Sequence, residues 1–365
     1  MTVVLGVLLA ASACGGTPRK VNRGDGQVRG IAAAKLPFRI VRVDGGRQIA
    51  MDELISELAS ARAVCIGETH TNPHDHWAQL ELFDRLSAQN EGNRISTALG
   101  MEMFQRPFQG VLDDFAAGKI DDKALLSLAG WNQRWGYDWN LYRPIVHLAR
   151  DRGASIIALN ISTELKVKVR ENGVDQLSPE DKQNVPELDL ENEGHRAWWS
   201  SLMKEMGGAD AHTTQKKHDS EADHESDQDQ EKTPAEQPDT PAGEDPEDGE
   251  PPAGSDDTAA EGEPAEKPKE AVDEAERMYM IQVLWDETMA ETAAGWVRGG
   301  INRQIIILAG NGHCHDSAIV ARVRRRGVEK VVSIRPVIDK ADGEVAGLLA
   351  APENDFLFVM EMPSH

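Results

Sequence analysis

Between residues 304 and 313 the chain reads Gln304-Ile-Ile-Ile-Leu-Ala-Gly-Asn-Gly-His313. A short, continuous apolar run rich in β-branched residues is typical of a strand that is buried on both faces. A second run of this kind, Ala63-Val-Cys-Ile66, leads directly into Gly67-Glu-Thr-His70. Both strands are therefore followed by the form Gly-x-x-His. The sequence predicts two central strands of a sheet, each with a histidine just beyond its end.

The pattern around these two strands alternates strands with helices. Strands that follow one another through intervening helices imply a mainly parallel sheet flanked by helices, so the fold class is α/β. Apolar runs predict further strands over 38–43, 95–103, 155–160, 330–334 and 356–360, and helical spacing predicts helices over 51–58, 76–88, 105–117, 121–128, 141–152, 274–297 and 317–326.

The formal charge of −23 belongs mainly to one segment. Residues 208–276 hold 24 Asp and Glu against 5 Lys and Arg, whereas the rest of the chain holds 38 against 34. A segment with this composition buries too little apolar surface to offset the entropy of ordering it. We expect a long disordered acidic insert over 207–276. No basic stripe stands out elsewhere, so we expect no nucleic-acid partner.

The N-terminus has the features of an export signal. Residues 1–13 are apolar, are too short to span a bilayer and end in small residues directly before Cys14. The sequence Leu-Ala-Ala-Ser-Ala-Cys14 resembles a bacterial lipobox, in which the cysteine is acylated. Residues 1–14 are thus expected to be a lipoprotein signal peptide with its acylated Cys, and 15–35 a tether. This places the protein in the cell envelope, lipid-anchored to the outer membrane and facing the periplasm. Cys65 and Cys314 are expected to be two separate thiols.

Polar side chains lie at or just beyond the ends of four of the predicted strands. Glu68 and His70 follow one strand and His313 follows another, whereas Glu102 and Asn160 lie at the ends of two further strands. In open α/β sheets, ligands bind just beyond the carboxyl ends of the strands. We therefore expect these side chains to line one ligand pocket.

The chemistry of that pocket has two interpretations. Two imidazoles with one or two carboxylates suit a divalent transition metal (Mn, Co, Fe or Zn), with His70, Glu68, Glu102 and His313 as ligands. A histidine flanked by glutamate can also act as a general base on water without any metal. Residue types alone leave both open.

Aromatic residues are concentrated over 131–144, in the sequence Trp131-Asn-Gln-Arg-Trp-Gly-Tyr137-Asp-Trp-Asn-Leu-Tyr142-Arg-Pro144. These rings could form a packed core, or a cleft for a planar ligand. In the second case, a Tyr oxygen could ligate ferric haem iron, and Arg143, with Arg134, could pair with propionates.

The motifs together resemble the ChaN-like family of bacterial lipoproteins implicated in haem binding and iron uptake. The resemblance rests on Gly67–His70 with His74 and His76, on Gly100–Phe104, on Trp135–Tyr142, on Gln282–Ala290 and on Ala309–His313. This family belongs to a superfamily with Tiki metalloproteases, TraB-like proteins and erythromycin esterases.

The resemblance implies an α/β domain over 36–206 and 277–362, with a helical subdomain and a cofactor seated between the two. It implies a haem-binding lipoprotein in haem or iron handling, in which Tyr142, Tyr137, Arg143 and His74 bind haem or another small planar ligand. The alternative is a metal-dependent hydrolase in which Glu68, His70, Glu102 and His313 are catalytic. A homodimer is a further expectation.

Overall fold

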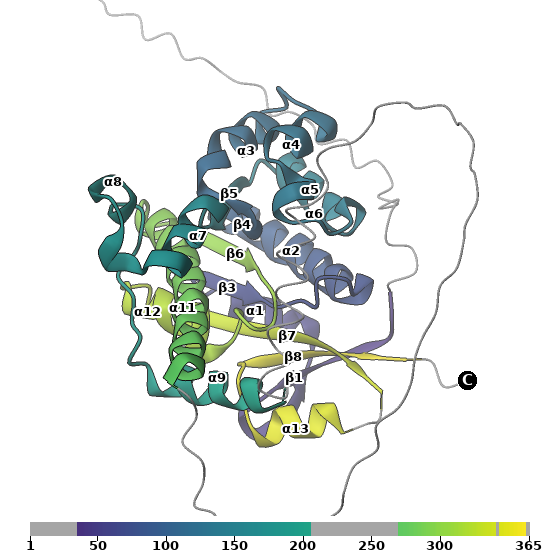
Figure 1. The fold of residues 1–365 in the computed structure, drawn as a ribbon. Helices are drawn as coiled ribbons and strands as arrows, with labels where there is room; N and C mark the ends of the chain where they lie inside the picture. Colours follow the sequence, from purple (N-terminus) through teal and green to yellow (C-terminus); the bar gives the residue numbers. More distant parts are fainter. Residues whose placement is uncertain (1–34, 206–268, 341–342, 363–365) are drawn as a thin grey trace, which may run out of the picture.

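The computed structural model describes residues 35–205, 269–340 and 343–362 (Figure 1). Eight strands form one sheet in the order β2-β1-β8-β7-β3-β6-β4-β5. The six strands from β8 to β5 run parallel, and β1 pairs antiparallel with both β2 and β8. The strands are β1 (Phe38–Arg42), β2 (Arg47–Ile49), β3 (Ala63–Ile66), β4 (Ser96–Gln105), β5 (Ser155–Asn160), β6 (Arg303–Leu308), β7 (Val331–Asp339) and β8 (Phe356–Glu361).

Helices cover both faces of this sheet, because alternate residues of each strand point to opposite sides. In β3, Val64 and Ile66 pack into the core under α1, α2 and the group α3–α6, whereas Ala63 and Cys65 pack under α11 and α12. The helices are α1 (Met51–Leu58), α2 (Pro73–Asn93), α3 (Gln109–Ala116), α4 (Asp122–Leu128), α5 (Trp131–Arg134), α6 (Trp139–Asp151), α7 (Thr163–Asn172), α8 (Pro179–Lys182), α9 (Glu193–Glu205), α11 (Lys269–Arg298), α12 (Ala321–Arg325) and α13 (Glu344–Ala350).

The predicted fold class is confirmed: the sheet is mainly parallel and flanked by helices. Helices α3–α6 form a group at the β4–β5 end of the sheet, which is the helical subdomain expected from the resemblance (Figure 1). No helix of the described residues is both long enough and apolar enough to span a membrane. The predicted signal peptide, Cys14 and almost all of the tether lie outside the described residues, as does most of the acidic insert.

One predicted boundary of the insert is wrong. Helix α11 begins at Lys269, inside the range 207–276 that acidity assigned to the insert. Residues 269–276 contain neither Gly nor Pro and are mostly Ala, Glu and Lys, which are strong helix formers. Acidic composition therefore concealed residues 269–273, which extend the helix predicted over 274–297 toward its N-terminus.

The expectation of two separate thiols is also wrong. Cys65 and Cys314 form a disulfide, with their Cα atoms 5.5 Å apart. In the parallel register, Cys65 lies beside Ile307 of β6. After β6 the chain turns within a few residues, since the amide groups of His313 and Cys314 both donate to the carbonyl of Gly310. That turn returns Cys314 to the sheet face on which Cys65 lies.

Candidate functional site

The predicted polar residues meet at the carboxyl edge of the parallel strands. Glu68 and His70 follow β3, His313 follows β6, and Glu102 lies in β4 where its pairing with β5 shifts register. Gly310 lies where they meet. A methyl group at that position would lie 2.9 Å from Cε1 of His70 and 3.8 Å from Oε2 of Glu102. The convergence comes from the sheet itself, as expected for the ends of neighbouring parallel strands.

Glu68 is a buried carboxylate with three hydrogen-bond donors. Its Oε1 accepts from the hydroxyl of Tyr142 at 2.7 Å and lies 2.9 Å from Nδ1 of His70, and its Oε2 accepts from Nε2 of Gln79 at 2.8 Å. Burial alone would raise the pKa of Glu68, but the charge of nearby His76 and these hydrogen bonds outweigh it, so the pKa lies below its usual value. An ionised carboxylate can only accept, so Nδ1 of His70 carries the proton.

His70 lies at the surface of this network among aromatic rings. Its side chain is 27% exposed. Its ring centroid is 4.8 Å from that of Trp135 and 5.0 Å from that of Tyr137, and these two rings are 5.4 Å apart. We name His70, Trp135 and Tyr137 the aromatic platform. Because Nδ1 of His70 is engaged by Glu68, the lone pair of this imidazole is on Nε2.

Electrostatics around the platform are dominated by the two buried glutamates. Burial lowers the pKa of His70. The hydrogen bond to Glu68 and the charge of Glu102 raise this pKa by a larger amount, so the net shift is upward. Burial raises the pKa of Tyr137, and the charges of Glu102 and Glu68 raise it more. The Glu68 and Glu102 carboxylates therefore favour the protonated forms of His70 and Tyr137.

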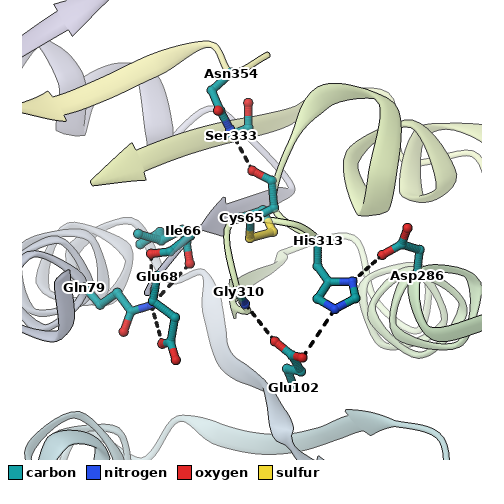
Figure 2. Close-up of a disulfide and its surroundings, with 12 residues drawn as sticks. Cys65, Ile66, Glu68, Gln79, Glu102, Asp286, Gly310, His313, Ser333 and Asn354 are labelled. Atoms are coloured by element: carbon teal, nitrogen blue, oxygen red, sulfur yellow. Dashed lines mark hydrogen bonds and ion pairs between the residues drawn. A yellow bond between two sulfur atoms is a disulfide. The ribbon is translucent and has the colours of Figure 1, made fainter. Parts of the chain in front are cut away.

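A second network holds His313. Figure 2 shows Glu102 between the backbone of Gly310 and the His313 ring, with Asp286 on the far side of that ring. The amide of Gly310 donates to Oε2 of Glu102 at 2.7 Å, and Oε1 lies 3.5 Å from Nε2 of His313. Nδ1 of His313 lies 2.7 Å from Oδ1 of Asp286. Burial lowers the pKa of His313, but Glu102 and Asp286 outweigh it and raise the pKa to about 9.

Asp286 itself lies between two histidines. Its other oxygen is 3.1 Å from Nε2 of His195 and 3.8 Å from Arg322, and all three side chains are buried. Burial would raise the pKa of Asp286, yet the close contact with His195 and the charge of His313 hold it far below its ordinary value. The carboxylate is thus ionised and neutralised entirely by protein groups.

The metal interpretation of the four residues is not supported. Within residues 35–205, 269–340 and 343–362, no group of three or more His, Cys, Asp or Glu side chains is arranged to hold a metal ion. The carboxylates that were assigned to a metal accept hydrogen bonds instead, Glu68 from Tyr142 and Gln79 and Glu102 from Gly310.

The predicted haem-binding residues are placed very differently. Tyr142 is fully buried, with its hydroxyl directed to Glu68, whereas Tyr137 is half-buried in the platform. Arg143 donates to Asp122 at 2.5 Å on the helical group. The side chain of Asn72 caps the start of α2 by accepting a hydrogen bond from the backbone amide of His74. The haem-binding role of these residues stays a prediction, and Tyr137 is the tyrosine that lies beside His70.

Several side chains support the residues of the site from neighbouring elements. Asn160 donates to the carbonyl of Glu102 at 3.0 Å, so it holds the strand rather than lining the pocket. In the sequence, Gln282 and Asp286 are only part of the segment Gln282–Ala290 and have no predicted role. They lie four residues apart on one helix. Residues at this spacing share a helix face, and both contact Nδ1 of His313. His195 lay in a stretch with no recognised motif, and no sequence signal indicated its role.

A known protein family matches most of the chain. The family model described as "Haem-binding uptake, Tiki superfamily, ChaN" matches residues 54–323, well over half of the chain. The chain belongs to this family. Among curated proteins, none matches the sequence significantly.

A solved structure shares this fold. A ChaN protein of Campylobacter jejuni, described with cofacial haem binding, is similar at a TM-score of 0.59 and 15% identity, over 89% of this chain and 97% of that one. A mutant erythromycin esterase in its open conformation (TM-score 0.39, 13% identity, 83% and 77% coverage) and a succinoglycan biosynthesis protein (0.36, 13%, 79% and 69%) are more distant. At these identities the likeness concerns the fold.

Proposed function

We propose that this protein binds haem at the aromatic platform of His70, Trp135 and Tyr137. The observation that carries the proposal is the platform itself: two half-buried aromatic rings, Trp135 and Tyr137, flank the half-buried imidazole of His70, whose Nδ1 is held by a buried carboxylate. The rings are tilted by 44–75° to one another, so their faces and edges offer apolar contact to a planar macrocycle. His and Tyr are also axial ligands of haem iron. Membership of a haem-binding family supports the same ligand.

In this proposal, each residue of the platform has a separate role in binding haem. His70 and Tyr137 supply the candidate axial ligands, and Trp135 supplies apolar contact area. Glu68 orients the His70 ring by accepting the hydrogen bond from Nδ1, and this hydrogen bond makes the Nε2 lone pair a stronger metal ligand. Bound haem would supply the iron that this donor coordinates.

A haemin titration of the purified chain tests the proposal. We expect a Soret shift at micromolar haemin, with Tyr137→Phe and His70→Ala each weakening binding by about tenfold or more. The matched control is His147→Ala, which removes an imidazole of α6 that contacts Asp122 and should leave binding unchanged. A wild-type chain without a Soret shift contradicts the proposal, as does a Tyr137→Phe, His70→Ala double variant that binds like the wild type.

The proposal extends to the place where the protein works, as a lipid-anchored envelope protein facing the periplasm that handles haem iron. The support is the lipobox-like sequence before Cys14 and the Cys65–Cys314 disulfide, since disulfides persist in oxidising compartments. We expect Cys14→Ser to move the protein from the membrane fraction to the soluble envelope fraction. If Cys14→Ser stays in the membrane fraction, the anchor is elsewhere. The proposed homodimer is tested by sedimentation with and without haemin.

A further inference from the structure

The Cys65–Cys314 disulfide lies directly next to the ligand site. Cys65 is three residues before Glu68, and Cys314 follows His313 immediately. Both are buried, and the bond spans 249 residues of sequence. Figure 2 shows the bridge between β3 and the turn that carries Gly310 and His313. The bond therefore joins the two strand ends from which the site is built.

The two loops that the bridge joins are packed with almost no free space. The amide of Asn311 donates to the carbonyl of Glu68 at 2.9 Å. A methyl group at Gly67 would lie 2.1 Å from the side-chain oxygen of Asn311, and one at Gly310 would lie 3.2 Å from Nε2 of His70. A small shift of the turn 310–314 would therefore change the surroundings of His70.

The turn has a second support on its other side. Nδ2 of Asn354, a buried side chain just before β8, donates to the carbonyl of Cys314 at 2.7 Å. The disulfide and Asn354 thus hold Cys314 from two directions. This turn also positions the Gly310 amide so that it donates a hydrogen bond to Glu102.

We propose that the Cys65–Cys314 disulfide and Asn354 are positioning elements of the ligand site, which hold the turn 310–314 against His70 and Glu102. Their role as haem-site elements rests on the proposed function, whereas their effect on His70 can be measured without haem.

The test uses the full chain with Cys65→Ala and Cys314→Ala combined. NMR of the ligand-free protein follows the His70 ring signals. We expect them to shift, and the pKa of His70 to fall toward its ordinary value, because Glu102 is no longer held beside it. The haemin titration should show about tenfold weaker binding and a changed Soret maximum.

The control for lost stability is Leu54→Ala, a fully buried position in α1 away from the site. It should lower the melting temperature without moving the His70 signals or the Soret maximum. Asn354→Ala keeps the disulfide and should give a smaller change of His70 in the same direction, so the proposal is testable even where the cysteine variant fails to fold.

The outcomes separate the two proposals. Unchanged His70 signals in both variants overturn the positioning role, as does a shift of the same size in Leu54→Ala. A wild-type chain that binds no haemin contradicts the proposed function alone, since the His70 signals are measured without ligand.

Discussion

At Gly310 the two halves of the site approach so closely that hydrogen is the only side chain that fits. The backbone there donates to Glu102 and packs against the edge of His70. A glycine that permits such close approach is a packing requirement rather than a flexible joint.

Replacing Gly310 with alanine should therefore damage the site more than the fold. The added methyl group would lie 2.9 Å from Cε1 of His70, so the ring must move. We expect haemin binding to weaken by roughly tenfold or more, with a change in stability on the order of 1 kcal/mol. Haemin titration and urea unfolding measure the two effects. Gly110→Ala, in α3 with nothing within 4 Å, is the matched control and should leave binding unchanged. Full affinity in Gly310→Ala would show that the His70 ring position is unimportant.

At this scale the sequence predicted which residues meet but not what they do. Parallel strands bring the residues at their carboxyl ends to one edge of the sheet. This explains why Glu68, His70, Glu102 and His313 meet. Their roles depend on partners from distant segments. Tyr142 was predicted as a ligand, yet it lies 74 residues from Glu68 in sequence and bonds to it in the interior. Strand periodicity carries no information about that pairing.

Helix α11 connects the site to helix α12 through two adjacent buried acids, Asp286 and Glu287. Asp286 points to His313, and Glu287 accepts from Arg325 at 2.7 Å and from Arg326 at 2.5 Å. Arg322 lies 3.3 Å from the same carboxylate. Arg322 and Arg325 lie in α12, and Arg326 directly follows it, so α12 is attached to α11 through Glu287.

Removal of Glu287 should cost much more stability than removal of an exposed acid on the same helix. Glu287→Ala leaves the buried Arg322 beside no carboxylate at this position, and breaking a buried ion pair typically costs about 3–5 kcal/mol. Glu291→Ala removes a half-exposed pair with Arg106 and should cost about 1 kcal/mol or less. Urea unfolding compares the two variants. Equal losses in both would mean that Glu287 contributes no more than a surface pair.

Element prediction succeeded where a buried apolar pattern was present. The bounds of α1 and β3 agree with the expected 51–58 and 63–66, since each presents a clear apolar face or run. Helices α7 (Thr163–Asn172) and α13 (Glu344–Ala350) were not predicted. Helix α13 has no fully buried residue, and α7 buries only Leu165 and Val169. Such helices are stabilised by where the sheet places them, which local sequence does not reveal.

For the molecule as a whole, the formal charge of −23 says little about the folded part, because most of it lies in residues 208–276. The decisive charges are internal. Glu102, His313, Asp286 and His195 form a buried chain in which carboxylates and imidazoles alternate. Such a chain is stable only in one overall protonation state, so folding stability must depend on pH.

The last prediction concerns that dependence on the alkaline side. The pKa of His313 is raised to about 9 in the folded protein, against 6.5 for an ordinary histidine. Its contribution to stability is therefore fully present below pH 6.5 and is lost as the pH rises through 9. We expect the free energy of unfolding to fall by up to about 3 kcal/mol between pH 6.5 and 9.5. Urea unfolding across this range measures the slope.

The His313→Asn variant should lose most of this slope and keep the part that comes from His70, whose pKa is also raised. His147→Asn, which changes a histidine of α6 outside the site, should keep the whole slope. His315 does not interfere, because burial lowers its pKa to about 3 and its contribution is lost only on the acid side of pH 6.5. A wild-type stability that stays constant up to pH 9.5 would mean that His313 is neutral in the folded protein. Glu102 and Asp286 would then face an uncharged ring, and the buried chain would carry a net negative charge.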